Sequence, residues 1–349
     1  MTTMQLDTES LKHLAIHFVG NKNKAETLAV SDQLLELDED TLNALQSGLL
    51  HKFKSIPERY CFHHASSLQY NEVYNYCKQL FESPADLLPL SASIARHLYE
   101  ASVHPKVKGG ELYIAFFEGI PVESRMCKAI GLFKTENKSL FIDVQPDGNH
   151  FQLLMKEGVE LNKFDKGCLV LHTKEEEGYE VLLFDNQNRG EEAAYWRETF
   201  LGLKPQNDSF HHTQHFLSLT KQFITSELDK EGVVDKKEQI ELLNKSLDYF
   251  RAKESFDIEE FQTEVFADDN VIGSFRDFGS RYIQSNDFDI ASNFDISLDA
   301  VKKQTRIFKS VVKLDKNFHI YIHGRTDLIE KGVDEQGRKF YKIYYQDEM

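Results

Sequence analysis

The side chains best suited to bind a ligand are concentrated in residues 300–325, AVKKQTRIFKSVVKLDKNFHIYIHGR. This segment holds seven lysines and arginines and one acid, Asp315, so its net charge is +6, whereas the whole chain carries −16. Lysine and arginine bind phosphates, and aromatic side chains placed between them can stack on bases or sugars. The segment is therefore the first candidate for a nucleic-acid surface.

The segment also has the pattern of a β-hairpin. In residues 306–314 and 318–324, side chains of different polarity alternate. The three residues between the two stretches end in an asparagine, which tolerates a left-handed turn. The predicted register pairs Leu314 with Phe318, Val312 with Ile320 and Ser310 with Ile322. Because strand side chains alternate between two faces, we expect the first two of these pairs to be buried neighbours.

The opposite face of the same hairpin pairs Lys313 with His319, Val311 with Tyr321 and Lys309 with His323. We expect Lys309, Lys313 and Tyr321 to point outward. An alternative is that these lysines only keep an exposed strand edge soluble. The predicted nucleic-acid-binding residues are Lys302, Lys303, Arg306, Lys309, Lys313, His319, Tyr321, His323 and Arg325.

Other patterns that can support chemistry are weaker. His211 and His215 in HHTQH have a spacing that can bind a metal on a helix, but no third ligand is identifiable. The stretch 287–295 is similar to a calcium loop, yet Ser292 stands where glycine is required. No phosphate-binding loop, dinucleotide fingerprint or G-x-S-x-G is present. The sequence therefore predicts a protein that is not an enzyme, with no cofactor and no metal.

Composition limits the class of protein. The 349 residues are 41% hydrophobic and 28% charged, which is typical of a globular chain with room for two domains. There is no apolar run of eighteen residues, so no membrane segment is expected, and the N-terminus lacks the pattern of a secretory signal. The four cysteines form no C-x-x-C pair, which favours a reducing cytosol. The acidic balance argues against broad nucleic-acid binding, so any such binding must be local.

The first part of the chain predicts an antiparallel sheet flanked by helices. Helices are expected from about residue 40 and over 83–101. Strands are expected at 14–19, 112–117, 128–133, 139–144, 168–173 and 180–185. We expect 128–133 to pair with 139–144 across the polar turn TENK, and 168–173 to pair with 180–185.

The stretch GLKPQNDS at 202–209 is the predicted boundary, giving domains 1–203 and 204–349. Beyond it, apolar residues recur at helical spacing in two stripes, and Asp235 with Glu238 predicts a helix start. The stripes are Phe216, Leu219 and Phe223, then Ile240, Leu243, Leu247 and Phe250. The predicted fold class is therefore α+β, with a mainly helical C-terminal region that ends in a β-hairpin.

A block of opposite charge precedes the basic segment. Residues 257–299 contain eleven acids against Arg276 and Arg281, a net charge of −9. Adjacent blocks of opposite sign indicate that each has a partner, either the other block or another molecule. We therefore hypothesise that the acids restrain the affinity of the basic segment for phosphates.

Several segments together resemble the bacterial nucleoid-associated protein family. They are LAIHFVGNKNKAE, HPKVKGGELYIAFFEG, DNQNRGEEAAYWRETFLGLKPQND and VKKQTRIFKSVVKLDKNFHIYIHG, in the same order as in the family. The resemblance covers nearly the whole chain. It implies a cytoplasmic protein on the bacterial nucleoid and supplies no catalytic motif.

Three functions remain open at this stage. The favoured one is binding to DNA, expected to be double-stranded, without base specificity through the basic hairpin. In the second, the hairpin binds an acidic protein or a second copy of the chain, and association with DNA is indirect. The third and least favoured is a metal-dependent hydrolase that uses His211 and His215.

Overall fold

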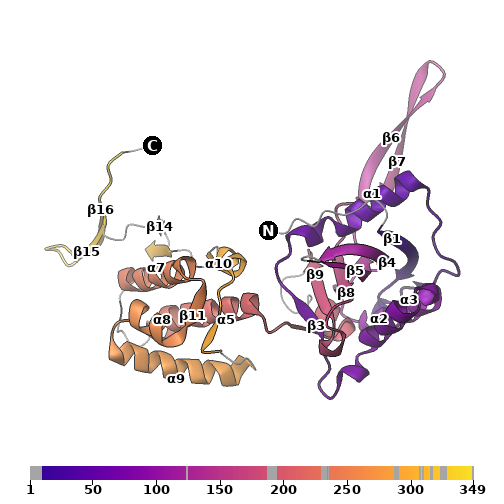
Figure 1. The fold of residues 1–349 in the computed structure, drawn as a ribbon. Coiled ribbons are helices and arrows are strands. Elements are labelled where there is room, and N and C mark those ends of the chain that lie inside the picture. Colours follow the sequence, from indigo (N-terminus) through magenta and orange to yellow (C-terminus); the bar gives the residue numbers. More distant parts are fainter. Residues whose placement is uncertain are drawn as a thin grey trace. The chain divides into compact units, whose positions relative to one another are not determined.

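The structure is a computed structural model. It describes residues 10–122, 125–186, 195–228, 234, 236–286, 291–305, 308, 310–314, 317–322 and 328–347. The chain divides into two compact units, Met1–Gln206 and Asn207–Met349 (Figure 1). The first combines an antiparallel sheet with helices and the second is mainly helical, so the predicted α+β class is confirmed.

In the described part of unit 1, eight strands form one sheet in the order β10-β3-β9-β8-β5-β4-β1-β2, and all neighbours are antiparallel. The strands are β1 (Leu11–Val19), β2 (Leu28–Ala29), β3 (Tyr60–Phe62), β4 (Gly110–Val122), β5 (Arg125–Lys134), β8 (Lys166–Leu171), β9 (Glu180–Asp185) and β10 (Leu203–Pro205). The predicted pairing of 168–173 with 180–185 is confirmed as β8 and β9.

Both faces of this sheet are covered, which explains why β4 is almost continuously apolar. Leu112 and Ile114 pack with residues of helices α2 (Glu72–Glu82) and α3 (Leu87–Ala101). Ala115 and Phe117 pack with residues of helix α1 (Glu39–Leu50) on the other face. The short turns of unit 1 are η1 (Lys22–Lys24), η2 (Lys52–Ser55), η3 (Leu68–Tyr70), η4 (Pro84–Asp86), η5 (Glu175–Glu177) and η6 (Tyr195–Phe200).

The predicted helices of unit 1 are present with a shifted start. Helix α1 begins after Asp38, whose carboxylate accepts a hydrogen bond from Thr41 N. The helix predicted from Ser83 instead opens with the 3-10 turn η4, and α3 follows from Leu87. Ser83 makes no side-chain capping hydrogen bond, so the Ser-Pro signal marks the turn rather than the α-helix.

The pairing predicted between 128–133 and 139–144 is wrong. Strand β5 has both edges occupied by β4 and β8. The following strand, β6 (Ser139–Asp147), pairs instead with β7 (His150–Gly158) and forms a separate two-stranded ribbon that projects from the sheet (Figure 1). Gly148 adopts a left-handed φ of 59° in the tight turn, and Asp-Gly at this place is a hairpin signal.

Unit 2 is built on an aromatic core. Its helices are α5 (Ser209–Gln222), η7 (Phe223–Glu227), α7 (Lys236–Ala252), α8 (Ile258–Val265), α9 (Asp269–Asn286) and α10 (Leu298–Thr305), with a short ladder of β11 (Ser255–Asp257) and β12 (Asn293–Asp295). Every residue of the two predicted apolar stripes is buried, as predicted. The ring centre of Phe216 lies 4.2 Å from that of Phe256 and 5.0 Å from that of Phe261. Asp235, the predicted start of α7, lies outside the described residues.

Two hairpins follow α10 in the sequence. They are β13 (Ser310–Leu314) with β14 (Phe318–Ile322), and β15 (Ile329–Val333) with β16 (Lys339–Ile343). Phe308, just before β13, is buried among the aromatic side chains of unit 2 and connects the first hairpin to that core.

Candidate nucleic-acid interface

The predicted register of the basic hairpin is confirmed. Leu314 lies opposite Phe318, and Lys313 lies opposite His319. The pairs of Ser310 with Ile322, Val311 with Tyr321 and Val312 with Ile320 complete the ladder. His319 and Tyr321 therefore share one face of β14, because side chains two positions apart point to the same side.

The prediction that Leu314 and Phe318 are buried neighbours is wrong. Phe318 is 64% exposed, and Leu314 and Ile320 are only half-buried. The reason is architectural: β13 and β14 form a sheet of two strands, and a hairpin packed only near its base leaves the turn end uncovered. The side chain of Val312 is outside the description.

The outward face agrees with the prediction where it is described. Tyr321 is 59% exposed, and His319 is exposed beside it. The side chain of Lys313 is not among those described. Four of the predicted site residues lie outside the described part of the chain altogether: Arg306, Lys309, His323 and Arg325.

Lys302 and Lys303 lie on helix α10 and not on the hairpin. Both side chains are exposed, because α10 turns Ala300, Val301 and Gln304 inward. Lys302 Nζ lies 3.4 Å from Asp299 Oδ1, and Lys303 Nζ lies 5.5 Å from the ring centre of Phe210. The structure thus places Lys302 and Lys303 on α10, Lys313 on β13, and His319 and Tyr321 on β14.

The acidic block is engaged in several ways. Glu260 and Glu264 bind Lys253 at 2.7 and 2.9 Å, and Asp257 caps α8 through the backbone of Glu259 and Glu260. These acids therefore stabilise unit 2 itself, through ion pairs and a helix cap. Asp299 differs, because its partner is Lys302, a residue of the predicted site. The restraint of the basic segment by the acidic block stays a prediction.

The two histidines of the predicted metal motif lie close together on α5. The ring centres of His211 and His215 are 4.1 Å apart. Among the described residues, no group of three His, Cys, Asp or Glu side chains is placed to hold a metal ion. The geometry therefore adds no third ligand to this pair. None of the helices in the described residues has both the length and the apolar composition of a membrane-spanning segment.

A hollow of about 410 Å³ lies between η7, α7 and α9 in unit 2. Its lining combines the apolar Leu228, Leu242 and Phe266 with three acids, Glu238, Glu241 and Asp268, and one lysine, Lys245. The net negative charge of this lining repels phosphate, so the hollow does not suit nucleic acid.

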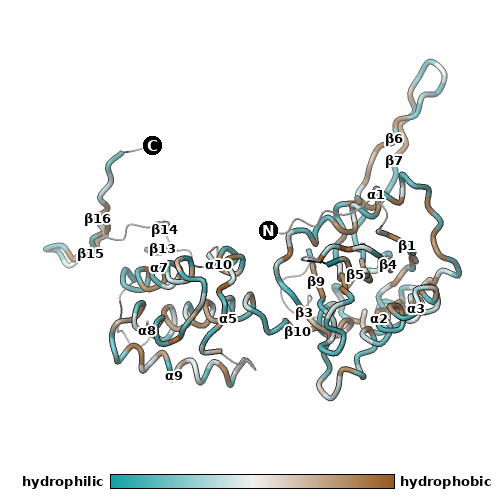
Figure 2. Tube along the Cα trace, in the orientation of Figure 1, coloured by the Kyte–Doolittle hydropathy of each residue, from teal (hydrophilic) through white to brown (hydrophobic). Residues whose placement is uncertain are grey.

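One feature that the sequence reasoning missed is the ribbon β6–β7, which we call the arm. Its strands alternate so that one face is mixed, with Phe141 and Leu154 beside an ion pair of 2.6 Å between Lys156 and Asp143. The other face is apolar and open to solvent: Leu140, Ile142, Val144, Phe151, Leu153 and Met155 are between 55% and 75% exposed. Figure 2 shows hydrophobic residues along both strands. A contiguous exposed apolar face of this size is typical of an interaction surface.

The arm could have been found in the sequence. Residues 140–144 and 151–155 flank Asp147-Gly148, a hairpin signal, at nearly equal distance. The polar turn TENK is a second hairpin signal just before it, and that signal predicts the pairing of β5 with β6. No local signal indicates that the apolar face is left exposed by the described residues.

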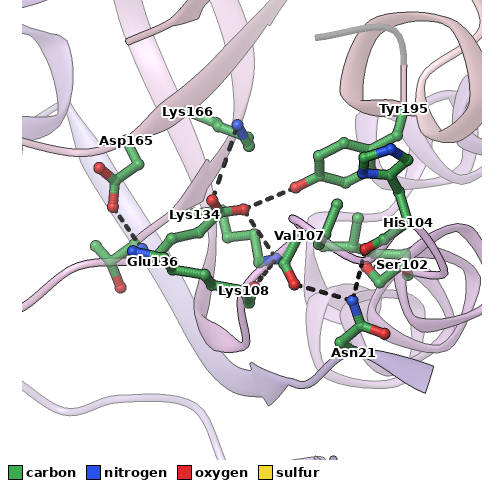
Figure 3. A network of polar contacts seen from close by, with 12 residues as sticks. Asn21, Ser102, His104, Val107, Lys108, Lys134, Glu136, Asp165, Lys166 and Tyr195 are labelled. Atoms are coloured by element: carbon green, nitrogen blue, oxygen red, sulfur yellow. Dashed lines mark hydrogen bonds and ion pairs between the residues drawn. The ribbon is translucent and has the colours of Figure 1, made fainter. Parts of the chain in front are cut away.

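A second missed feature is a buried network of charged side chains at the base of the arm (Figure 3). Glu136 Oε1 accepts hydrogen bonds from Lys134 Nζ at 3.1 Å and from Tyr195 Oη at 2.8 Å. Lys166 Nζ donates to both oxygens of Asp185 at 2.9 Å. The side chains of both lysines are fully buried. Charged residues at strand ends usually lie in solvent, so the sequence gives no sign that these are inside.

Burial changes the acidity of this network. Desolvation lowers the pKa of Lys134, although the charge of Glu136 opposes the effect. Burial, assisted by the negative charge of Glu136, raises the pKa of the Tyr195 phenol. Tyr195 therefore stays a hydrogen-bond donor, and the network has the character of a fixed anchor.

Comparison with known proteins identifies the family of the chain. No curated protein matches the chain. A family model described as nucleoid-associated protein YejK matches residues 15–338, which include the sheet, the arm, the helices of unit 2 and the basic hairpin. Because the match covers most of the chain, the protein belongs to this family of nucleoid-associated proteins.

Proposed function

We propose that the protein binds double-stranded DNA without base specificity through a patch formed by α10 and the hairpin β13–β14. The observation that supports it is the exposure of Lys302 and Lys303 on α10 and of His319 and Tyr321 on β14, in a chain of a nucleoid-associated family. The remaining members of the patch are proposed on sequence alone.

Contact with the phosphate backbone follows from the residue types. Lysines act as point charges toward phosphates, and the exposed Tyr321 can pack on a sugar. Base readout generally requires paired donors and acceptors held against base edges. The described side chains of the patch do not form such a fork. The affinity is therefore expected to be electrostatic, with dissociation constants on the order of 10⁻⁴ to 10⁻⁶ M at physiological salt.

The proposed role is structural association with the nucleoid of a bacterial cytoplasm, without catalysis. The family is named for its place with DNA, and no motif of this chain corresponds to a reaction.

The test is the salt dependence of binding. Fluorescence anisotropy of a labelled duplex, with the whole protein at about 50 to 200 mM salt, should give a slope of log K against log salt near −3.6 if about four cations reach phosphates. Affinity would then fall about a hundredfold over this range. The double variant Lys309→Glu and Lys313→Glu should flatten the slope and weaken all sequences alike.

A matched control is the double variant Lys174→Glu and Lys204→Glu. It replaces two exposed lysines of unit 1 and changes the net charge of the protein by the same amount. The control should keep the wild-type slope. If the hairpin variant also keeps it, the DNA surface lies elsewhere.

A second candidate function is self-association through the arm. Six large apolar side chains on one face, each more than half exposed, present about 600–800 Å², taking about 150–200 Å² for a fully exposed large side chain. A stable interface buries about 800 Å² per partner. A flat apolar ribbon matches a copy of itself about a two-fold axis, so a second copy of the chain is the proposed occupant. The exposed Phe318 of the basic hairpin also leaves open a protein partner at that site.

A further inference from the structure

Two loops of unit 1 form a second cationic surface. Residues 20–26, GNKNKAE, and 104–109, HPKVKG, carry four lysines and one acid, although the whole chain has a net charge of −16. The lysines are Lys22, Lys24, Lys106 and Lys108, and all four are exposed. We call these four residues the lysine platform.

Hydrogen bonds hold the two loops together. Asn21 is fully buried, and its Nδ2 donates to His104 O at 2.8 Å and to Val107 O at 2.9 Å (Figure 3). Asn23 Nδ2 donates to Val103 O at 2.8 Å. Lys24 Nζ donates to Val107 O at 3.2 Å, which places its charge beside the residue between Lys106 and Lys108.

Glycines let the two backbones approach. A Cβ at Gly109 would lie 3.2 Å from the Cα of Gly20, and a Cβ at Gly20 would lie 2.5 Å from the Cβ of Glu26. Only glycine fits such contacts without a shift of the backbone. The loops therefore have one packed arrangement.

The buried network supports the platform from below. Lys134 Nζ donates to Lys108 O at 2.8 Å, and the same ammonium is held by Glu136 (Figure 3). Binding to an ordered surface costs less entropy than binding to loose loops. The lysines are thus mounted on a rigid base.

The acids near the platform differ in their partners. Glu100 pairs with Lys22, and Glu111 pairs with Lys138 at 2.7 Å. Glu26 accepts a hydrogen bond from the neutral Asn21 N at 2.8 Å and keeps its negative charge. By contrast, Lys24 donates to a backbone carbonyl, and Lys108 Nζ donates to the amide oxygen of Asn137 at 2.8 Å. Neutral partners fix a lysine without cancelling its charge, so the charges of Lys24 and Lys108 can attract an anion from solvent.

We propose that the lysine platform is a second contact site for the phosphate backbone of duplex DNA, separate in sequence from the basic hairpin. This inference rests on the proposed function and adds a site to it. Lys24, Lys106 and Lys108 supply three point charges on adjacent loops, which suit successive phosphates of a backbone. Two or more contact regions on one chain also explain how an acidic protein can bind a polyanion.

The experiment uses the full chain and the triple variant Lys24→Gln, Lys106→Gln and Lys108→Gln. Anisotropy of a labelled duplex of about thirty base pairs is measured from about 50 to 200 mM salt. If three platform contacts add to the four of the hairpin patch, the slope of log K against log salt for the wild type is about −6.3, and the triple variant should return it to about −3.6. Affinity at about 50 mM salt should fall at least tenfold.

The matched control is Lys54→Gln, Lys174→Gln and Lys204→Gln, which removes the same charge from exposed lysines elsewhere in unit 1. It should keep a slope close to that of the wild type. The variant with arginine at residues 24, 106 and 108 should bind like the wild type, which separates loss of charge from damage to the loops.

The outcomes separate the two proposals. If the wild type binds DNA and the platform and control variants have equal slopes, the platform is overturned and the proposed function stands. If the arginine variant binds as weakly as the glutamine variant, charge is not the cause and the platform is again overturned. If the wild type does not bind duplex DNA, both proposals fail.

Discussion

The arm and the basic hairpin are the same backbone element with different side chains. Each is an antiparallel sheet of two strands with exposed side chains on both faces. The apolar face of the arm is made of leucine, isoleucine, valine, phenylalanine and methionine, whereas one face of the hairpin carries His319 and Tyr321. An isolated hairpin is marginally stable in water, so each needs support from its base or from a partner.

The two hairpins also differ in how the base is held. Asp165 accepts hydrogen bonds from the backbone of Glu136 and from Asn137 N at 2.9 Å, next to the buried ions at the foot of the arm. Phe308 holds the foot of the basic hairpin in an aromatic core. The exposed face therefore determines the kind of partner, and the anchor determines how firmly that face is presented.

The largest expected effect tests the anchor of the arm. Glu136→Ala leaves two buried lysines without their shared carboxylate, and breaking a buried ion pair costs about 3–5 kcal/mol. Urea unfolding followed by fluorescence of Trp196, the sole tryptophan, reports on unit 1. The control Glu160→Ala removes an exposed pair with Lys163 and should cost under about 1 kcal/mol. Equal costs would show that the network does not anchor the arm.

The next effect tests the apolar face of the arm. Leu153→Asp places a charge at a site that is 66% exposed in the single chain, and a two-fold interface would carry the change twice. Sedimentation equilibrium should show the dissociation constant rise at least a hundredfold, about 2.7 kcal/mol. Gln152→Asp changes the neighbouring residue on the mixed face and should leave association nearly unchanged. If both variants associate like the wild type, the arm does not mediate self-association.

A smaller effect tests the charge around the hairpin. Changing Asp287, Asp289, Asp295 and Asp299 to Asn removes four acids, one of which pairs with Lys302. Affinity for duplex DNA at low salt should rise about two- to tenfold, because steering depends on the summed field. The gain should vanish near 1 M salt, where the screening length is about 3 Å. An unchanged affinity at low salt in a folded variant would mean that the acids only solvate unit 2.

The last prediction concerns the stability of unit 1 at alkaline pH. All four cysteines lie in unit 1, and burial raises the pKa of each thiol, that of Cys127 to about 11. The unfolded chain ionises these thiols first, near pH 8.5, so the stability of unit 1 is complete below that pH and falls as pH rises. Lys52 and Lys134, whose pKa values are lowered by burial, act in the opposite direction, but they are two groups against four.

Urea midpoints from Trp196 fluorescence at about pH 7 to 10 check this expectation. The midpoint should fall above about pH 8.5. A midpoint that rises over this range would mean that the lysines affect the stability more than the thiols do.

Much of the fold follows from local patterns. The stripes of Phe216 and Leu247, the strand at 14–19 and the register of Lys313 with His319 were all predictable, because periodicity and turn chemistry act over a few residues. The division into two domains near residue 203 stays a proposal. In the structure, Lys204 and Pro205 pair with β3 and belong to unit 1.

The errors occurred where distant segments compete for the same edge or cover. Strand β6 lost its predicted partner because β4 and β8 occupy both edges of β5, a fact set by chain segments on either side. Phe318 is exposed because no third element covers the end of its hairpin in the described structure.

The sequence by itself determined the elements of this protein, its charge contrast and its family resemblance, because these depend on residue type and spacing. Only the tertiary structure decided which charges are buried and which apolar residues are exposed. Lys134 and Lys166 lie inside because strand β9, the loop that holds Lys108 and the ring of Tyr195 pack against them. Leu153 lies outside because nothing in the described chain closes over the arm. Burial is a property of segments far apart in sequence, so no local pattern contains it.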